Sequence, residues 1–239
     1  KIPFFSLWSN KSLIKQLTWR EIIGRYKGSL LGLSWSFFNP LIMLAVYTFV
    51  FSVVFEARWG VERASSKADF ALVLFTGLII HAFFSEVLVS APQLITSNIN
   101  FVKKVVFPLE ILSVVSLGAA LFHSFVSLLV LLLTLFLLNG VINPTVIFLP
   151  FTFLPLIPLA LGTSWFFSSL GVYVKDIGQL TGVLVTVLMF LSPIFYPIES
   201  LPYTFQILMQ FNPLTLPIEL SREVLIFGNL PNFKLLSAY

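Results

Sequence analysis

A run of 64 residues, from Ile111 to Val174, contains no Asp, Glu, Lys or Arg. Soluble domains carry about 25% charged residues, so a chain of this size has no way to bury such a run away from water. One helical membrane crossing takes about 20 apolar residues, and the run is long enough for two. The whole chain agrees, with 58% hydrophobic and only 10% charged residues among 239. We therefore predict an integral membrane protein.

Five transmembrane helices can be read from the hydropathy of the chain. The expected spans are Phe37–Phe55, Phe70–Val89, Ile111–Leu138, Thr145–Val174 and Ile177–Tyr196. Three prolines in the fourth span predict a bend. The sequence starts at Lys1 rather than Met and ends in an apolar stretch, so we expect a short N-terminal piece and a sixth span to lie outside it. The predicted fold is an all-α membrane protein, a polytopic bundle of six transmembrane helices per subunit of which five are readable.

The basic residues predict the orientation of these spans. Nine Lys and Arg fall in the N-terminal segment and in the alternate loops on its side, against five on the other side. The excess of Lys and Arg faces the cytoplasm in multi-pass proteins. We therefore expect residues 1–36 to form a cytoplasmic N-terminal segment and residues 37–239 to form the transmembrane domain.

An amphipathic helix is predicted within the N-terminal segment. Trp19, Ile22, Ile23, Tyr26 and Leu30 recur at helical spacing and form one apolar stripe. Three basic residues occupy the other side: Arg20, Arg25 and Lys27. A basic amphipathic helix of this kind lies in the headgroup plane. It either anchors the chain to the membrane or holds a lipid phosphate at the cytoplasmic entrance.

A second amphipathic segment lies between the second and third spans. Ile95, Ile99, Val102 and Val106 recur on one face, and Lys103 and Lys104 lie off it. Such a helix either rests on the bilayer or docks in a groove of a soluble partner.

Short apolar pieces bounded by proline follow the fifth span, on the outer side of the membrane. They are too short to cross it, and we interpret them as re-entrant or interfacial helices. Glu219 and Arg222 are spaced i, i+3 and can pair on one of these pieces. As an exposed pair they would contribute about half a kcal/mol.

The chain lacks the motifs of nucleotide-binding and hydrolytic enzymes, including the P-loop and the zinc-protease and serine-hydrolase signatures. With two His and no Cys, we expect no metal site and no catalytic residue, and the net charge of +4 is too small to argue for nucleic acid. Glu86 is the one acid inside a span, so it is either functional or paired with Lys103 or Lys104 near the cytoplasmic end. His81 and His123 are expected to be hydrogen-bonded packing residues. Any energy used should therefore come from a partner.

Four sequence pieces together resemble the permease subunit of ABC-2 type exporters, in the branch that exports O antigen, capsule or teichoic acid. They lie in family order: Arg20-Glu21 with Arg25–Trp35 and Asn39-Pro40, then Phe101–Glu110, then Leu191–Pro197, then Asn212–Thr215 with Arg222. The resemblance implies a permease domain that forms a homodimer and pairs with two copies of a separate ATP-binding subunit, which would bind ATP and Mg. It implies no cofactor in this chain, an undecaprenyl-diphosphate-linked polysaccharide as substrate, and the bacterial cytoplasmic (inner) membrane as location.

The resemblance also implies roles for individual residues. The basic N-terminal helix would lie where the lipid-linked substrate enters. A coupling helix would dock on the ATPase through Asn98, Lys103, Lys104, Phe107, Pro108 and Glu110. Aromatic side chains would line the channel: Phe37, Phe38, Tyr47, Phe190, Phe195 and Tyr196. An outer gate would include Pro202, Pro213, Glu219 and Arg222.

Two alternatives remain open at this point. The first is an ABC-2 permease for drugs or ordinary lipids, which shares the architecture and differs in its cargo. The second is an ATP-independent scramblase or enzyme acting on polyprenyl lipids, which would need clustered acids or His near the interface.

Overall fold

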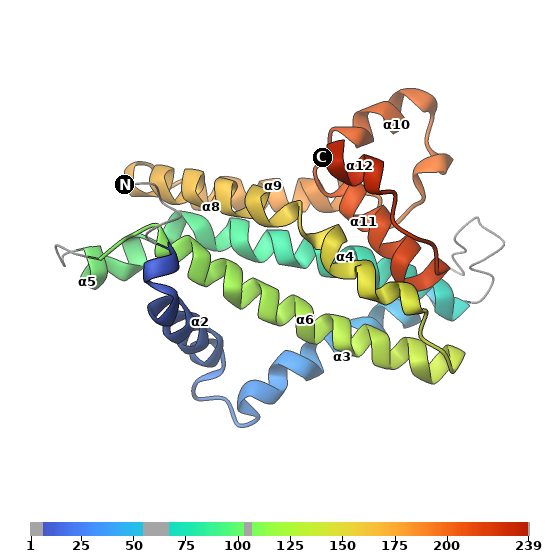
Figure 1. Cartoon of the computed structure of the whole chain (residues 1–239), viewed down its shortest axis with the longest axis horizontal. Helices are drawn as coiled ribbons and strands as arrows, with labels where there is room; N and C mark the ends of the chain where they lie inside the picture. The colour runs from blue at the N-terminus through green and yellow to red at the C-terminus, as the bar shows by residue number, and fades with distance from the viewer. Residues whose placement is uncertain (1–6, 55–66, 103–106, 239) are drawn as a thin grey trace. The chain divides into compact units, whose positions relative to one another are not determined.

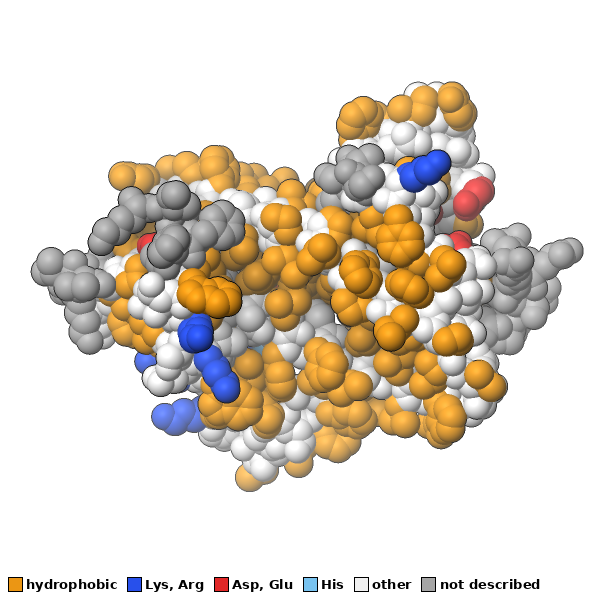
Figure 2. All heavy atoms as spheres, viewed as in Figure 1, with side chains coloured by type: hydrophobic (Ala, Val, Ile, Leu, Met, Phe, Trp, Pro, Cys, Tyr) orange, Lys and Arg blue, Asp and Glu red, His pale blue; other side chains and the backbone are white. Residues whose placement is uncertain are grey.

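The computed structural model describes residues 7–54, 67–102 and 107–238, and every regular element among them is helical. Within this part of the chain, four helical segments are long and apolar enough to cross a membrane. They are Gly32–Phe51, Phe70–Gln93, Ile111–Asn139 and Pro144–Tyr173. The prediction of a polytopic helical membrane protein is therefore confirmed. Figure 2 shows the composition behind it, with hydrophobic side chains over most of the visible surface and few charged ones.

The helices corresponding to the first four spans lie close to the predicted positions. The first span begins earlier than expected, as α3 (Trp35–Tyr47) followed by the π-helical η2 (Thr48–Val54), and residue 55 lies outside the described residues. The second and third are α4 (Lys67–Ser90) and α6 (Ile111–Asn139). The fourth is divided, as the prolines predicted, into η5 (Pro144–Phe148), α7 (Leu149–Phe153) and α8 (Leu156–Tyr173).

The fifth predicted span is shorter than expected. Its helix, α9, runs from Ile177 to Leu191 and has 15 residues. At 1.5 Å per residue this is about 22 Å, less than the thickness of the hydrocarbon core. The chain turns after Leu191, because Pro193 cannot donate a backbone hydrogen bond to continue the helix. The prediction of a helical span reaching Tyr196 was therefore wrong at its C-terminal end.

The chain divides into two compact units, and α4, α6, α8 and α9 contribute to both. The first unit comprises Lys1–Trp35, Phe83–His123 and Ile157–Thr186. The second comprises Ser36–Ala82, Ser124–Leu156 and Val187–Tyr239. Figure 1 labels the helices of both.

In the first unit, the N-terminal helix α2 (Lys11–Tyr26) packs on the start of α6. Leu17 is buried together with Ile111 and Val115. At Gly118 a Cβ would lie 2.9 Å from the Thr18 side chain, so the glycine permits this close approach. A second close approach occurs in the same unit, where α8 meets the 3-10 turn η3 (Ala91–Gln93). A Cβ on Gly171 would overlap the backbone of Pro92.

The predicted amphipathic stripe of α2 is only partly present. The helix ends at Tyr26, because Lys27 adopts an extended conformation and Gly28 has a positive φ of 87° that favours glycine. Leu30 therefore lies outside the helix and is fully exposed. Within the helix Ile22 is buried, whereas Trp19 and Ile23 are exposed. The prediction of one stripe from Trp19 to Leu30 was wrong at its end.

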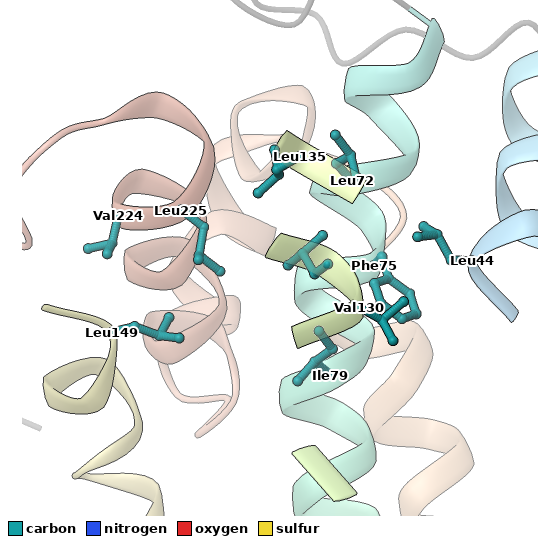
Figure 3. Packing of buried hydrophobic residues seen from close by; sticks show 10 residues of the cluster. Leu44, Leu72, Phe75, Ile79, Val130, Leu135, Leu149, Val224 and Leu225 are labelled. Atoms are coloured by element: carbon teal, nitrogen blue, oxygen red, sulfur yellow. The ribbon is translucent and has the colours of Figure 1, made fainter. Parts of the chain in front are cut away.

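In the second unit, the core forms around α4. Its buried side chains come from five elements: Leu44 of α3, Leu72, Phe75 and Ile79 of α4, Val130 and Leu135 of α6, Leu149 of α7, and Val224 and Leu225 of η7 (Glu223–Phe227) (Figure 3). Most side chains of α4 from Phe70 to Leu88 are buried, whereas Leu44 is the only buried residue of α3. In this unit α3 therefore presents an apolar surface on nearly all sides, as a lipid-facing helix does.

The C-terminal part of the second unit contains short helices, as the proline-bounded pieces predicted. They are η6 (Ile198–Ser200), α10 (Tyr203–Gln210), α11 (Thr215–Arg222), η7 and α12 (Phe233–Ala238). At 1.5 Å per residue, none of them is long enough to cross a bilayer.

Candidate functional site

The first unit holds a polar cluster made by Arg25, Glu86 and His123. Arg25 Nη2 lies 2.9 Å from Glu86 Oε1, and His123 Nδ1 lies 2.8 Å from the same oxygen. Arg25 comes from the last turn of α2, Glu86 from α4 and His123 from α6. The cluster therefore ties the predicted entrance helix to two membrane-spanning helices. Tyr26 adds an edge contact to the His123 ring.

The cluster gives Glu86 a partner that the sequence did not suggest. The expected partners, Lys103 and Lys104, lie outside the described residues. Among the described residues Glu86 pairs with Arg25, because α2 packs close to the helix that carries Glu86. The expectation that His123 is a hydrogen-bonded packing residue is confirmed. Nothing in the spacing of residues 25, 86 and 123 signals this contact, since they come from three separate segments.

The three basic residues predicted for the entrance occupy different environments. Arg25 is held in the cluster, with 52% of its side chain exposed. Arg20 lies over the Phe101 ring, with its guanidinium carbon 5.4 Å from the centroid. Lys27 follows the end of α2 and is exposed. Arg20 and Arg25 lie on α2 and Lys27 directly follows it, and Arg25 contacts Glu86 and His123 of α4 and α6.

The predicted coupling segment begins with η4 (Thr96–Asn98) and α5 (Ile99–Val102). Asn98 donates to the Leu94 carbonyl, and Phe107 stacks on Phe101 with ring centroids 4.6 Å apart. The backbone carbonyl of Glu110 accepts a hydrogen bond from Trp165 Nε1 of α8. Pro108 lies between these contacts. In this unit the segment borders a cavity of about 360 Å³ that Arg20, Glu21 and Asn98 help to line.

The predicted channel aromatics fall into separate groups within the second unit. Phe195 stacks with Phe190 at 5.9 Å and with Phe51 at 5.8 Å between ring centroids. Phe51 also contacts Phe70, which extends the row of rings. The Tyr196 hydroxyl donates to the Phe190 carbonyl. The sequence analysis missed Phe51 and Phe70, because an aromatic residue within an apolar span carries no signal of its own.

The remaining predicted aromatics lie on α3. Phe37 and Phe38 contact each other edge to face, with centroids 6.0 Å apart. Tyr47 is partly buried and packs against the core of the second unit. The structure therefore brings Phe190, Phe195 and Tyr196 together and leaves the α3 aromatics as a different group.

Arg222 is the most constrained of the residues predicted for the outer gate. Only 3% of it is exposed. Its guanidinium donates to three backbone carbonyls, those of Val73 at 3.0 Å, Pro193 at 2.6 Å and Ile194 at 3.0 Å. It thereby joins α11 to α4 and to the turn after α9. Burial lowers the pKa of Arg222 to about 9, so the side chain keeps its charge at neutral pH.

The sequence placed Glu219 and Arg222 on an exposed surface, and this was wrong for Arg222, which is buried and points into the protein. Glu219 borders a cavity of about 480 Å³ together with Glu199 and Glu223. Burial raises the pKa of Glu219 to about 7, Glu199 adds to the rise and Arg222 opposes it. The side chain thus titrates near neutrality, in an element outside the four membrane-capable segments.

The two predicted gate prolines mark the starts of short helices. Pro202 immediately precedes α10. Pro213 precedes α11, where Asn212 Oδ1 accepts from the Leu214 N–H and Asn212 Nδ2 donates to Leu191 and Ser192. Asn212 thus fixes α11 to the end of α9 within the second unit.

A buried hydroxyl pair adds a further attachment of α11. Thr152 of α7 and Ser221 of α11 lie 2.7 Å apart and are both buried. Sequence reasoning missed this pair, because Thr and Ser are common in membrane helices and their partners are set by tertiary packing.

Within the part of the chain that is described, no group of three or more His, Asp or Glu is arranged to hold a metal ion. The polar groups hold helices together: an arginine on carbonyls, a carboxylate shared by an arginine and a histidine, and paired hydroxyls. These contacts fix the positions of helices within each unit.

The fold and these contacts agree with a comparison against protein families. Residues 12–226 match the model of the ABC-2 type transporter family, which is most of the chain. The chain therefore belongs to the ABC-2 type transporter family.

Two curated relatives that the chain resembles are permeases of one kind. The chain is 30% identical over 106 residues to the O-antigen export system permease protein RfbA of Myxococcus xanthus, and the match covers 44% of this chain and 38% of the relative. It is 28% identical over 100 residues to a protein of the same name from Klebsiella pneumoniae, with 42% of this chain and 36% of the relative covered. The chain thus matches well under half the length of these relatives.

Proposed function

We propose that this chain is the transmembrane subunit of an ATP-driven exporter that moves a lipid-linked polysaccharide, such as O antigen, capsule or teichoic acid, across the bacterial cytoplasmic membrane. Two observations taken together support the proposal. The chain belongs to a transporter family, and its sequence lacks any nucleotide-binding motif. In this proposal an ATP-hydrolysing subunit supplies the energy for transport.

The proposed cargo rests on similarity and on the chemistry of the helices. Both relatives named above are O-antigen export permeases. The row of stacked rings Phe190, Phe195 and Phe51 supplies flat apolar faces on which sugars can slide. Aromatic rings bind sugars without the deep charged trap that would stall a long polymer. A channel for ions, by contrast, would need charge rings or a carbonyl filter.

The assembly we propose is a homodimer with two copies of the ATP-binding subunit, which binds ATP and Mg. The N-terminus faces the cytoplasm, as the excess of basic residues on its side predicts. Arg20, Arg25 and Lys27 receive the lipid diphosphate, and the segment from Asn98 to Glu110 docks on the ATPase. The C-terminal short helices around Arg222 form the outer gate.

The test is a strain in which this gene is deleted. The proposal predicts loss of the surface glycan and accumulation of its lipid-linked form in the cytoplasmic leaflet, with both restored by a plasmid copy. A normal glycan coat with altered drug resistance or lipid composition would instead support the ABC-2 permease for drugs or lipids.

A second test addresses the ATPase contact. Replacing Lys103 and Lys104 with Glu reverses two charges in the proposed docking segment, so we expect the ATPase to be lost from the purified complex while the chain still inserts in the membrane. Lys175 replaced with Glu is the control in a different loop. Export at the normal level by the double variant would overturn the assignment of the docking segment.

A further inference from the structure

The guanidinium of Arg25 is held by a carboxylate that belongs to a membrane-spanning helix. Arg25 Nη2 and Glu86 Oε1 are 2.9 Å apart, and the side chains are 52% and 19% exposed respectively. Glu86 lies within the candidate span Phe70–Gln93. A charged carboxylate in this position needs a partner, because an unpaired one in a membrane is costly. Arg25 is that partner, and it reaches in from the end of α2.

His123 is the second partner of the same carboxylate. Its Nδ1 lies 2.8 Å and 3.1 Å from the two Glu86 oxygens and 3.1 Å from Arg25 Nη1. Arginine only donates and an ionised carboxylate only accepts. The arrangement that satisfies the carboxylate therefore has the proton on Nδ1 and has it donated to Glu86, and the Arg25 Nη1 contact is then a close approach of two donors rather than a hydrogen bond. His123 is only 14% exposed, so it is fixed where it can keep this contact when Arg25 leaves.

Arg25 is more exposed to solvent than Glu86 and His123. Half of its side chain is exposed, and it lies in the last turn of α2, one residue before the helix ends at Tyr26. A guanidinium binds carboxylates and phosphates with the same fork of N–H donors. Glu86 and a phosphate therefore compete for the same donors. A diphosphate carries more negative charge than one carboxylate, and it approaches from the exposed side.

We propose that Glu86 is a built-in competitor for a polyprenyl diphosphate headgroup at Arg25. The inference rests on the proposed function, because it takes the lipid-linked substrate as the ligand. Before binding, Glu86 holds Arg25 and with it the end of α2. On binding, the diphosphate takes Arg25, and His123 alone keeps the Glu86 carboxylate. The exchange frees the Arg25 end of α2 from Glu86, while Leu17 keeps the rest of the helix packed on α6, so substrate binding changes how the entrance helix is attached.

The proposal predicts opposite effects from two residues that do not touch the ligand. Glu86→Gln weakens the competitor and should tighten binding of the lipid about fivefold, which is about 1 kcal/mol. His123→Phe removes the donor that satisfies Glu86 after the exchange, so it should weaken binding by a similar factor. In Glu86→Gln/His123→Phe the carboxylate is gone, and the effect of His123→Phe should disappear.

The experiment measures the dissociation constant of undecaprenyl diphosphate for the full chain in phosphatidylcholine nanodiscs, with inorganic pyrophosphate as a second probe. Arg25→Gln should weaken lipid binding and abolish the gain from Glu86→Gln. Lys15→Gln, an exposed cation on the same helix, and Glu199→Gln, an exposed carboxyl of the second unit, are the matched controls and should leave the constant unchanged.

The outcomes separate this inference from the proposed function. If lipid binding depends on Arg25 but Glu86→Gln leaves it unchanged or weaker, the competitor role is refuted and the entrance site stands. If Glu86→Gln tightens only pyrophosphate, the ligand is a free anion and the inference falls. If neither the wild type nor Glu86→Gln binds the lipid, both the inference and the proposed entrance are overturned.

Discussion

Replacing Arg222 with Met should destabilise the second unit strongly. The change removes all three hydrogen bonds from the guanidinium to Val73, Pro193 and Ile194. The acceptors are backbone carbonyls, so the substitution leaves them in place and removes the guanidinium donor from each. The side chain is 3% exposed, and water has little access to replace it.

The expected magnitude follows from the cost of breaking a buried polar network on one side only. Each unsatisfied buried carbonyl costs about 1–3 kcal/mol. Part of this loss is offset, because the Met variant no longer buries the charge of the guanidinium. We expect a net loss of about 3–5 kcal/mol in the free energy of unfolding. For a chain of this size that corresponds to a fall in melting temperature of roughly 10 °C. Arg222→Lys keeps the charge but lacks the planar guanidinium, so its melting temperature should lie between those of the wild type and Arg222→Met.

The assay is thermal unfolding of the purified chain in detergent, followed by circular dichroism. Arg20→Met is the matched control, because it removes an arginine that lies on the surface over Phe101. Its melting temperature should change by no more than a degree or two. A melting temperature of Arg222→Met within the same margin of the wild type would refute the reasoning that these three bonds hold the C-terminal helices.

Three further perturbations test individual contacts. Gly171→Ala should destabilise the chain by about 2 kcal/mol or more, because the added Cβ overlaps the backbone of Pro92. In the control Gly162→Ala, in the same helix, the added Cβ meets nothing within 4 Å, so this change should be neutral or slightly stabilising. Equal melting temperatures for the two variants would contradict the packing of Gly171 on Pro92. Thr152→Val should lower the free energy of unfolding by about 1 kcal/mol, because it leaves the Ser221 hydroxyl without this partner. The double variant Thr152→Val/Ser221→Ala should recover part of that loss. Strictly additive losses from the two single variants would argue against the hydroxyl pair. Glu219 has a folded-state pKa of about 7, above its ordinary value of 4.5, so as pH rises the unfolded state releases the proton first. The wild type should therefore lose on the order of 2 kcal/mol of stability relative to Glu219→Gln as pH rises from 4.5 to 7, with no further change above. A constant difference between the two melting temperatures across this range would rule the burial effect out.

The spans could be predicted from the sequence because they depend on a one-dimensional signal. A charge-free apolar run must lie in lipid, and α6 begins at the predicted Ile111 and ends one residue beyond the predicted Leu138. The bend of the fourth span was visible as prolines for the same reason, since proline removes a backbone donor wherever it stands.

The ends of helices were less predictable. The stripe of α2 continued in sequence to Leu30, but Gly28 adopts a positive φ and the helix ends at Tyr26. The spacing of apolar residues does not reveal the positive φ at Gly28, because Leu30, beyond the glycine, keeps the helical spacing by chance. Likewise α9 ends at Leu191, well before the end of its apolar run.

The polar contacts could not be predicted at all from spacing. Among the described residues Glu86 pairs with Arg25 of a distant segment, and Arg222 donates to three backbone carbonyls far from it in sequence. Both outcomes depend on which helices pack together in three dimensions. What the sequence did provide was the identity of the residues, since a single acid in a span and a single arginine among short apolar helices are each unusual enough to single out.

The most direct test of the central claim uses inverted membrane vesicles that contain this chain together with the ATP-binding subunit. A radiolabelled lipid-linked glycan is supplied on the outer, cytoplasmic face of the vesicles, and its protection from an added glycosidase is followed with time. Our account predicts that the glycan becomes protected only when ATP is present and only when both subunits are there. Protection without ATP, or protection by the ATP-binding subunit in vesicles that lack this chain, would contradict it.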